Sequence, residues 1–218
     1  MKMKPVLFNT DMNIEIRERR KSVTRRCVKY RDGYKQLPVP SEAEFIGIKD
    51  GQYVWTLDGV KFATTAPYHQ GDILYVRETY DELPVRPDGS FSETGSYLYY
   101  KADGDLRPRG WRDNWRPSLH MPKAVARTFL KVTEVRVEHL KDIFLNPPGP
   151  NNQIVREGFR YGGDFIAGWE NTIKKNERHI YGYDANPWVW VVEFELYWPE
   201  YKSDLTARPG LSAESEVI

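Results

Sequence analysis

One segment near the end of the chain shows most clearly which secondary structure the sequence forms: residues 188–196, which read WVWVVEFEL. Large apolar side chains recur at every second position, and this period of two predicts a β-strand with one apolar face. That face consists of Trp188, Trp190, Val192, Phe194 and Leu196, and the other face includes Glu193 and Glu195. Pro187 stands directly before the strand, where the ladder needs no backbone donor.

Two more segments predict long strands. Residues 73–80 follow a Gly71-Asp72 turn, and residues 127–137 are rich in apolar and β-branched side chains. The apolar phase of the second segment changes near Thr133, which predicts a bulge or a bend there. Together with residues 188–196, these strands form the predicted frame of the fold.

Asp-Gly pairs mark tight turns, because these residue types tolerate positive φ angles. They stand at residues 32–33, 50–51, 58–59, 88–89 and 103–104. Short β-prone runs around them predict a meander of small strands at 45–48, 52–56 and 60–63.

Few segments predict helices. One is expected at 11–20, capped by Asn9 or Thr10, one at 165–175, and a third beginning at Leu140 or Ile154. A hairpin-rich sheet with a few helices predicts a mainly β or α+β fold in which the sheet forms a small barrel.

Composition excludes several classes of protein. The 32 basic and 31 acidic residues give a formal net charge of +1, which argues against a protein that coats polyanions with its whole surface. Aromatic residues make up 14% and the mean hydropathy is −0.66, which excludes a membrane protein and does not fit a disordered chain. Cys27 is the only cysteine, so we expect no disulfide framework and no cysteine-based zinc site.

The 218 residues are enough for one domain with insertions. We expect that domain at 1–200, with insertions near 31–66 and 81–118, and a flexible Ser/Glu-rich tail at 201–218. The first five residues, MKMKP, lack the apolar region of a signal peptide, and we expect a cytoplasmic protein.

The densest charge lies at residues 17–31, where eight basic residues stand against Glu18 alone, a local net charge of +7. One interpretation is a solvated basic face at the end of a helix. The other is a site for phosphate, to which Arg20, Arg25 and Arg26 would contribute.

Lys21 and Thr24 stand three residues apart within this segment. A threonine hydroxyl is a poor nucleophile unless a base takes its proton, and lysine can serve only if its pKa is lowered. Neighbouring arginines would lower it by repulsion. A Lys-x-x-Thr pair also occurs by chance in many proteins.

Glu78 falls on the same face of its predicted strand as Leu74 and Val76. A carboxylate that points into a core must be paired or have a raised pKa, and a raised pKa suits a general acid or base. The alternatives are that the strand has reached the rim at Glu78, or that Glu78 forms a structural pair with an arginine.

Aromatic and basic residues alternate at 107–127, including Trp111, Trp115 and Arg116. Such interleaving suits base stacking with phosphate contact. The alternative is a loop whose tryptophans hold it against the core.

Motifs for nucleotide cradles and hydrolase elbows are absent, and the four histidines lack metal-site spacing. We therefore expect neither a metal nor a cofactor.

As a set, four segments resemble the ASCH domain family, whose fold is a PUA-like β-barrel. Residues 20–25, RKSVTR, are similar to its Gly-x-Lys-x-x-Thr-x-Arg signature, and residues 71–79, GDILYVRET, to a strand ending in glutamate. Residues 115–122 and 186–191 resemble a longer subfamily found in phage and prophage genomes. The matches span residues 4–197. The family's glycine is Arg19 here, where a bulky side chain is expected to change the turn or narrow the entrance.

The resemblance implies a cleft that holds Lys21, Thr24 and Glu78 and takes RNA or a modified nucleoside or nucleotide. Some bacterial members are amidohydrolases acting on N4-acetylcytidine. By that similarity, Thr24 would be the nucleophile, Lys21 its base and Glu78 the acid/base at the leaving amine. The alternatives are a non-catalytic RNA- or DNA-binding module, a ribonuclease, or a structural phage protein. A phage-encoded chain would act in the host cytoplasm.

Overall fold

The computed structural model describes residues 3–32, 34–91, 95–108, 110–111, 114–145 and 152–199. The tail expected at 201–218 lies outside these residues. Twelve strands and four α-helices are found in the described part, so the predicted mainly β or α+β class is confirmed.

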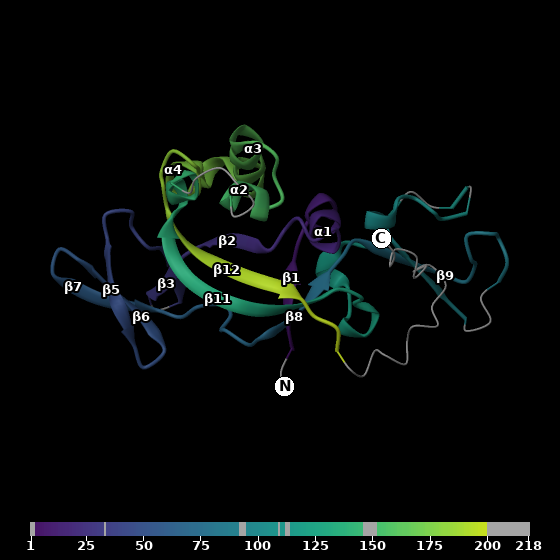
Figure 1. Cartoon of the computed structure of the whole chain (residues 1–218), viewed down its shortest axis with the longest axis horizontal. Coiled ribbons are helices and arrows are strands. Elements are labelled where there is room, and N and C mark those ends of the chain that lie inside the picture. Colours follow the sequence, from purple (N-terminus) through teal and green to yellow (C-terminus); the bar gives the residue numbers. More distant parts are fainter. Residues whose placement is uncertain are drawn as a thin grey trace, which may run out of the picture.

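A five-stranded sheet forms the centre of the molecule (Figure 1). Its strands in spatial order are β1 (Met3–Leu7), β8 (Ile73–Arg77), β11 (Phe129–His139), β12 (Trp188–Leu196) and β2 (Val23–Cys27). β1 runs parallel to β8, and the other neighbours are antiparallel. The three strands predicted as the frame are therefore the three central strands of this sheet.

The sheet curves but does not close. Among the described residues, no backbone ladder joins the edge strands β1 and β2, so the expected closed barrel is not formed. A side chain connects the edges instead: Nη2 of Arg26 on β2 donates to the carbonyl of Leu7 on β1 at 2.9 Å. We refer to this contact between the two edges as the seam.

The predicted irregularity in β11 is confirmed. The pairing of β11 with β12 shifts between Val132 and Glu134, which leaves Thr133 as the extra residue of a bulge. The predicted strand at 73–80 is shorter than expected: β8 ends at Arg77, and Tyr80 begins a new strand.

Smaller sheets extend from both ends of the molecule (Figure 1). The meander is β5 (Glu44–Lys49), β6 (Gln52–Leu57) and β7 (Val60–Thr64). Asp50-Gly51 and Asp58-Gly59 connect it with positive φ at all four residues, as the Asp-Gly pattern predicts. Two hairpins complete the strands: β3 (Lys29–Asp32) with β4 (Lys35–Pro38), and β9 (Tyr80–Leu83) with β10 (Tyr97–Tyr100).

The helices are short. They are α1 (Thr10–Arg17), α2 (Gln153–Arg156), α3 (Gly162–Thr172) and α4 (Arg178–Tyr181). Short 3-10 turns are η1 (Lys101–Asp103), η2 (Ser118–His120), η3 (Lys123–Val125), η4 (Leu140–Phe144) and η5 (Lys175–Glu177). Asn9 caps α1 by accepting from the amide of Met12 at 2.8 Å, as predicted. Both positions considered for the third helix carry one, since η4 begins at Leu140 and α2 contains Ile154.

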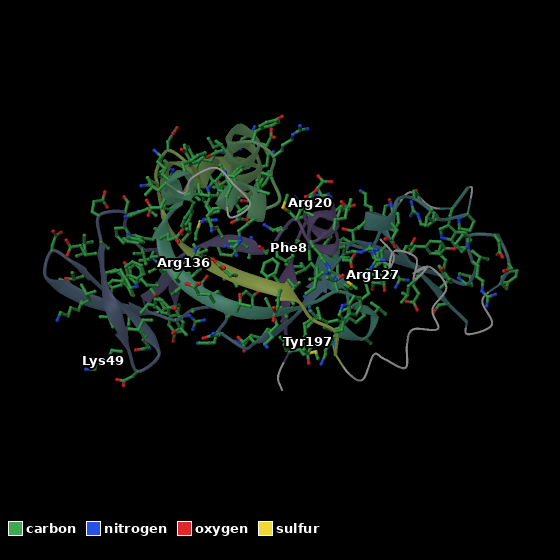
Figure 2. The ribbon with its side chains drawn as sticks, in the orientation of Figure 1. Phe8, Arg20, Lys49, Arg127, Arg136 and Tyr197 are labelled. Carbon is green, nitrogen blue, oxygen red and sulfur yellow. The ribbon has the colours of Figure 1, made fainter. Side chains whose placement is uncertain are left out.

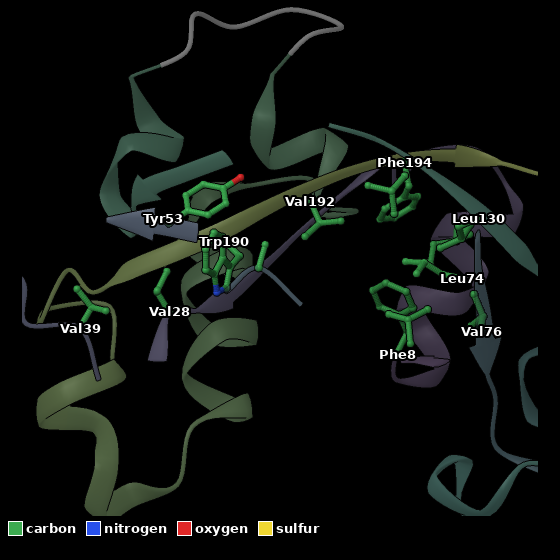
Figure 3. Close-up of a cluster of buried hydrophobic side chains, with 14 of the residues drawn as sticks. Phe8, Val28, Val39, Tyr53, Leu74, Val76, Leu130, Trp190, Val192 and Phe194 are labelled. Atoms are coloured by element: carbon green, nitrogen blue, oxygen red, sulfur yellow. The ribbon is translucent and has the colours of Figure 1, made fainter. Parts of the chain in front are cut away.

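The two faces of β12 pack into different hydrophobic cores. Val192 and its apolar neighbours pack with β1, β8, the meander and Ile16 of α1. Figure 3 shows Phe8, Leu74, Val76 and Leu130 gathered at one end of this core, and Trp190, Tyr53, Val28 and Val39 at the other. Val189 and Val191 on the opposite face pack under α2 and α3. None of the described helices has the length and apolar character that crossing a membrane requires.

Candidate functional site

The turn that leads from α1 into β2 presents the predicted motif. Arg19 has a φ of 61°, the left-handed conformation that glycine adopts without strain. The amides of Arg20 and Lys21 both donate to the carbonyl of Glu15, at 2.9 and 3.0 Å. The turn therefore forms with an arginine at the position of the family's glycine, and the Arg19 side chain is exposed.

Lys21 is buried, with 4% of its surface exposed. Its Nζ donates to the carbonyls of Val23 and Glu157, both at 2.7 Å, and to Oε2 of Glu157 at 2.6 Å. Burial lowers the pKa of Lys21, and the charges of Arg26 and Arg25 lower it further, while Glu157 opposes the change. The expected direction of the shift is found, although burial is its largest cause.

Thr24 lies on β2 directly opposite Val192 of β12, so both side chains face the core that contains Phe8. Only 2% of Thr24 is exposed. Among the described residues, no hydrogen bond to its hydroxyl is found, and none of the hydrogen bonds of Lys21 reaches it.

Glu78 is 1% exposed and is held by an arginine. Nε and Nη2 of Arg127 donate to its two carboxylate oxygens at 3.0 and 2.9 Å, and the hydroxyl of Thr128 lies 3.4 Å from Oε1. Arg127 in turn pairs with Asp103, which pairs with Arg17 at the end of α1. The structural arginine pair considered as an alternative is thus present.

Phe8 packs beside Lys21 and Arg26 of the predicted site. Its ring lies 5.7 Å from Nζ of Lys21 and 5.5 Å from the guanidinium of Arg26. It directly follows Leu7, which pairs with Arg77, the residue before Glu78. Figure 2 shows Phe8 near the centre of the molecule, with Arg127 farther toward the β9 end.

Carboxylates near the basic segment and from distant parts of the chain pair with several of its arginines. Arg20 pairs with Glu15 and Glu18, and buried Arg25 pairs with Glu157 and Glu138. Arg26 differs from both. It is exposed and, within the described part, its guanidinium contacts the carbonyls of Leu7 and Arg25 and the Phe8 ring but no carboxylate.

Trp115 and Arg116 of the aromatic segment lie at the β9–β10 hairpin, whereas Arg127 at the end of the segment pairs with Glu78. Trp115 packs on the core of the β9–β10 hairpin, and the guanidinium of Arg107 covers its ring at 4.0 Å. Arg116 pairs with Asp81 and Glu82. Trp111 is 39% exposed. For Trp115, the structure matches the alternative of a loop held against the core.

A pocket of about 500 Å³ lies elsewhere, beside the bulge in β11. Tyr53 and Tyr68 line it together with Thr133 and Glu134. None of the predicted site residues contributes to it.

Sequence reasoning missed three residues that contact the predicted ones, namely Phe8, Arg127 and Glu157. It also missed Asn13, whose Nδ2 donates to the carbonyl of Phe8 at 3.5 Å. Asn13 is buried, and its Oδ1 has no hydrogen-bond partner among the described residues. Glu157 lies 136 residues from Lys21, so no local pattern links them. The sequence predicted, as one alternative, that Glu78 pairs with an arginine, but it did not indicate that this arginine is Arg127.

Comparison of the chain with protein-family models, with curated proteins and with solved structures finds no match. In the part of the chain that the structure describes, no three His, Cys, Asp or Glu side chains are grouped to hold a metal ion.

Proposed function

We propose that this chain is an ASCH-type protein that binds a modified nucleoside and hydrolyses its N-acyl group, with an N4-acylcytidine as the substrate class. One observation carries the proposal: a buried lysine amine with a lowered pKa precedes a buried threonine by three residues, and the hydroxyl of that threonine is unengaged among the described residues. A lowered pKa lets a lysine amine lose its proton more readily, and the neutral amine can take a hydroxyl proton.

The proposed reaction assigns one step to each residue. The Thr24 oxygen bonds to the acyl carbon while its proton passes to Lys21. The carbon–nitrogen bond then breaks as the proton taken by Lys21 is transferred, through Glu78, to the leaving nitrogen. Water hydrolyses the acyl-threonine ester, which releases the acid and restores the hydroxyl. The net reaction consumes one water and needs no cofactor.

Two further groups support a nucleoside ligand beside Phe8. Arg26 presents an exposed guanidinium without a carboxylate partner in the described chain, which suits a phosphate or ribose oxygen. Oδ1 of Asn13 is a buried acceptor without a partner among the described residues, on the helix that follows Phe8. A buried polar atom in this condition can accept a hydrogen bond from an ordered water or from a ligand.

A second candidate is a nucleic-acid-binding module without catalysis. It is favoured by the full engagement of Lys21, whose ammonium has three donors and makes three hydrogen bonds. The carboxylate of Glu78 is likewise engaged, since it pairs with Arg127.

Incubation with N4-acetylcytidine, followed by chromatographic detection of cytidine and acetate, separates the two candidates. We expect release by the wild-type chain and its loss in Thr24→Ala. Thr65→Ala, at an exposed threonine after β7, is the matched control and should keep full activity. Binding without release by the wild-type chain would favour the module, and release that survives Thr24→Ala would refute the nucleophile.

A further inference from the structure

The only carboxylate in contact with Lys21 in the described structure belongs to Glu157, the residue that ends α2. Its Oε2 lies 2.6 Å from Nζ of Lys21, and its Oε1 lies 3.1 Å from Nη1 of Arg25. Glu157 is 3% exposed, so these contacts are made away from bulk water. The carboxylate of Glu157 therefore forms ion pairs with two buried cations.

The backbone holds Glu157 in place independently of its side chain. Lys21 and Glu157 form an isolated antiparallel bridge, and the amide of Ser22 donates to the carbonyl of Arg156 at 2.8 Å. Gly158 follows with a φ of 86°, and a Cβ at this position would come within 3.3 Å of Cβ of Lys21. The end of α2 thus approaches the Lys21 turn closely because residue 158 is a glycine.

Burial and the charges of Glu157, Arg26 and Arg25 act on the Lys21 amine. On β2, Arg25 and Arg26 disfavour its charged form, as does burial. The charge of Lys21 contributes to the lowered pKa of Glu15 on α1. Glu138 on β11 pairs with Arg25, which also pairs with Glu157. Because Glu157 alone among the described carboxylates contacts Nζ, it is the group that most strongly favours the ammonium.

We propose that Glu157 is a positioning residue that holds the Lys21 amine and sets the pH above which this amine becomes a base. The role of that base rests on the hydrolysis proposed above. Glu157→Gln keeps an acceptor oxygen but removes the charge, so no carboxylate in contact with Nζ opposes burial and the two arginines. Lys21 then loses its proton at a lower pH. Arg25→Gln removes a repelling charge and a competitor for Glu157, so the effect has the opposite sign.

The test is a titration that does not depend on turnover. Lysine labelled with ¹³C at Cε is incorporated, and the signal of Lys21 is assigned by its loss in Lys21→Met. We expect the midpoint for Lys21 to fall by about one pH unit or more in Glu157→Gln, and to rise in Arg25→Gln. Glu157→Asp keeps the charge but withdraws it by one methylene, so a smaller fall is expected.

Activity is measured on the same proteins. The acid limb of the kcat/KM profile for N4-acetylcytidine should move with the Lys21 midpoint, which a purely structural role for Glu157 would not produce. An unchanged midpoint in folded Glu157→Gln or Glu157→Asp overturns the inference. A shifted midpoint without turnover in the wild-type chain refutes the hydrolysis but leaves the control of the Lys21 charge by Glu157 established.

Discussion

Arg127 and Glu78 form a bidentate ion pair in which the carboxylate is almost completely buried and the guanidinium is at the edge of the core. Removing one partner of such a pair leaves a buried charge without compensation. We therefore expect Arg127→Met to lower the free energy of unfolding by about 3–5 kcal/mol, measured by urea denaturation. The double variant Glu78→Gln, Arg127→Met should recover part of this loss.

An exposed pair provides the control for that experiment. Lys131 and Glu195 lie 4.0 Å apart and are both largely exposed. Lys131→Met should change the unfolding free energy by less than about 1 kcal/mol. Equal losses in Arg127→Met and Lys131→Met would contradict the assigned difference in burial.

The left-handed conformation of Arg19 predicts a stabilising substitution. A residue with a Cβ pays roughly 1–2 kcal/mol in this region of φ, and glycine does not. Part of that gain is offset because glycine has a more flexible unfolded state. Arg19→Gly should therefore raise the unfolding free energy by about 0.5–1 kcal/mol. Arg19→Ala keeps a Cβ and should give no gain, so a gain in both variants would exclude backbone strain as the cause.

Cys27 should make stability depend on pH in the alkaline range. Burial raises the pKa of its thiol to about 11 from a usual value of 9.0. Between these values the unfolded chain releases a proton that the folded chain keeps, so the thiol's contribution to stability is present below pH 9 and is lost as pH rises toward 11. Urea denaturation at pH 8 and pH 10.5 measures the loss, which should be smaller in Cys27→Ala. The same loss in both proteins would show that other groups cause it.

Arg26 should carry most of the affinity for phosphate-bearing ligands. We expect Arg26→Ala to weaken binding of a cytidine-containing oligonucleotide by about tenfold and to reduce the salt dependence of binding, as measured by fluorescence anisotropy. Arg31→Ala, at an exposed arginine on β3, is the matched control. Equal effects of the two substitutions would indicate diffuse attraction instead of a site at Phe8.

Features that depend on neighbours in the sequence were predicted well. The alternation at 188–196 predicts β12 with its bounds. The phase change at Thr133 predicts the bulge, and two Asp-Gly pairs predict the turns of the meander. In each case the backbone geometry is determined by residues within a few positions. Local patterns are sufficient for such elements.

Features that depend on distant partners were not predicted. Asp103, Glu138 and Glu157, which lie far from the +7 segment in the sequence, offset part of its excess charge. Pairing between β1 and β8 ends at Arg77, so Glu78 leaves the ladder and meets Arg127 instead of continuing the strand. Only the folded chain shows which carboxylate meets which cation.

The seam joins two strand edges by a side chain instead of a backbone ladder, and an edge without a ladder is where a second chain can add by β-pairing and begin aggregation. β1 carries Lys4 and Pro5, and a proline has no N–H to offer to an incoming strand. β2 carries exposed Arg26, whose charge opposes stacking against another copy of the same edge. Residues at both edges of the open sheet therefore discourage self-association.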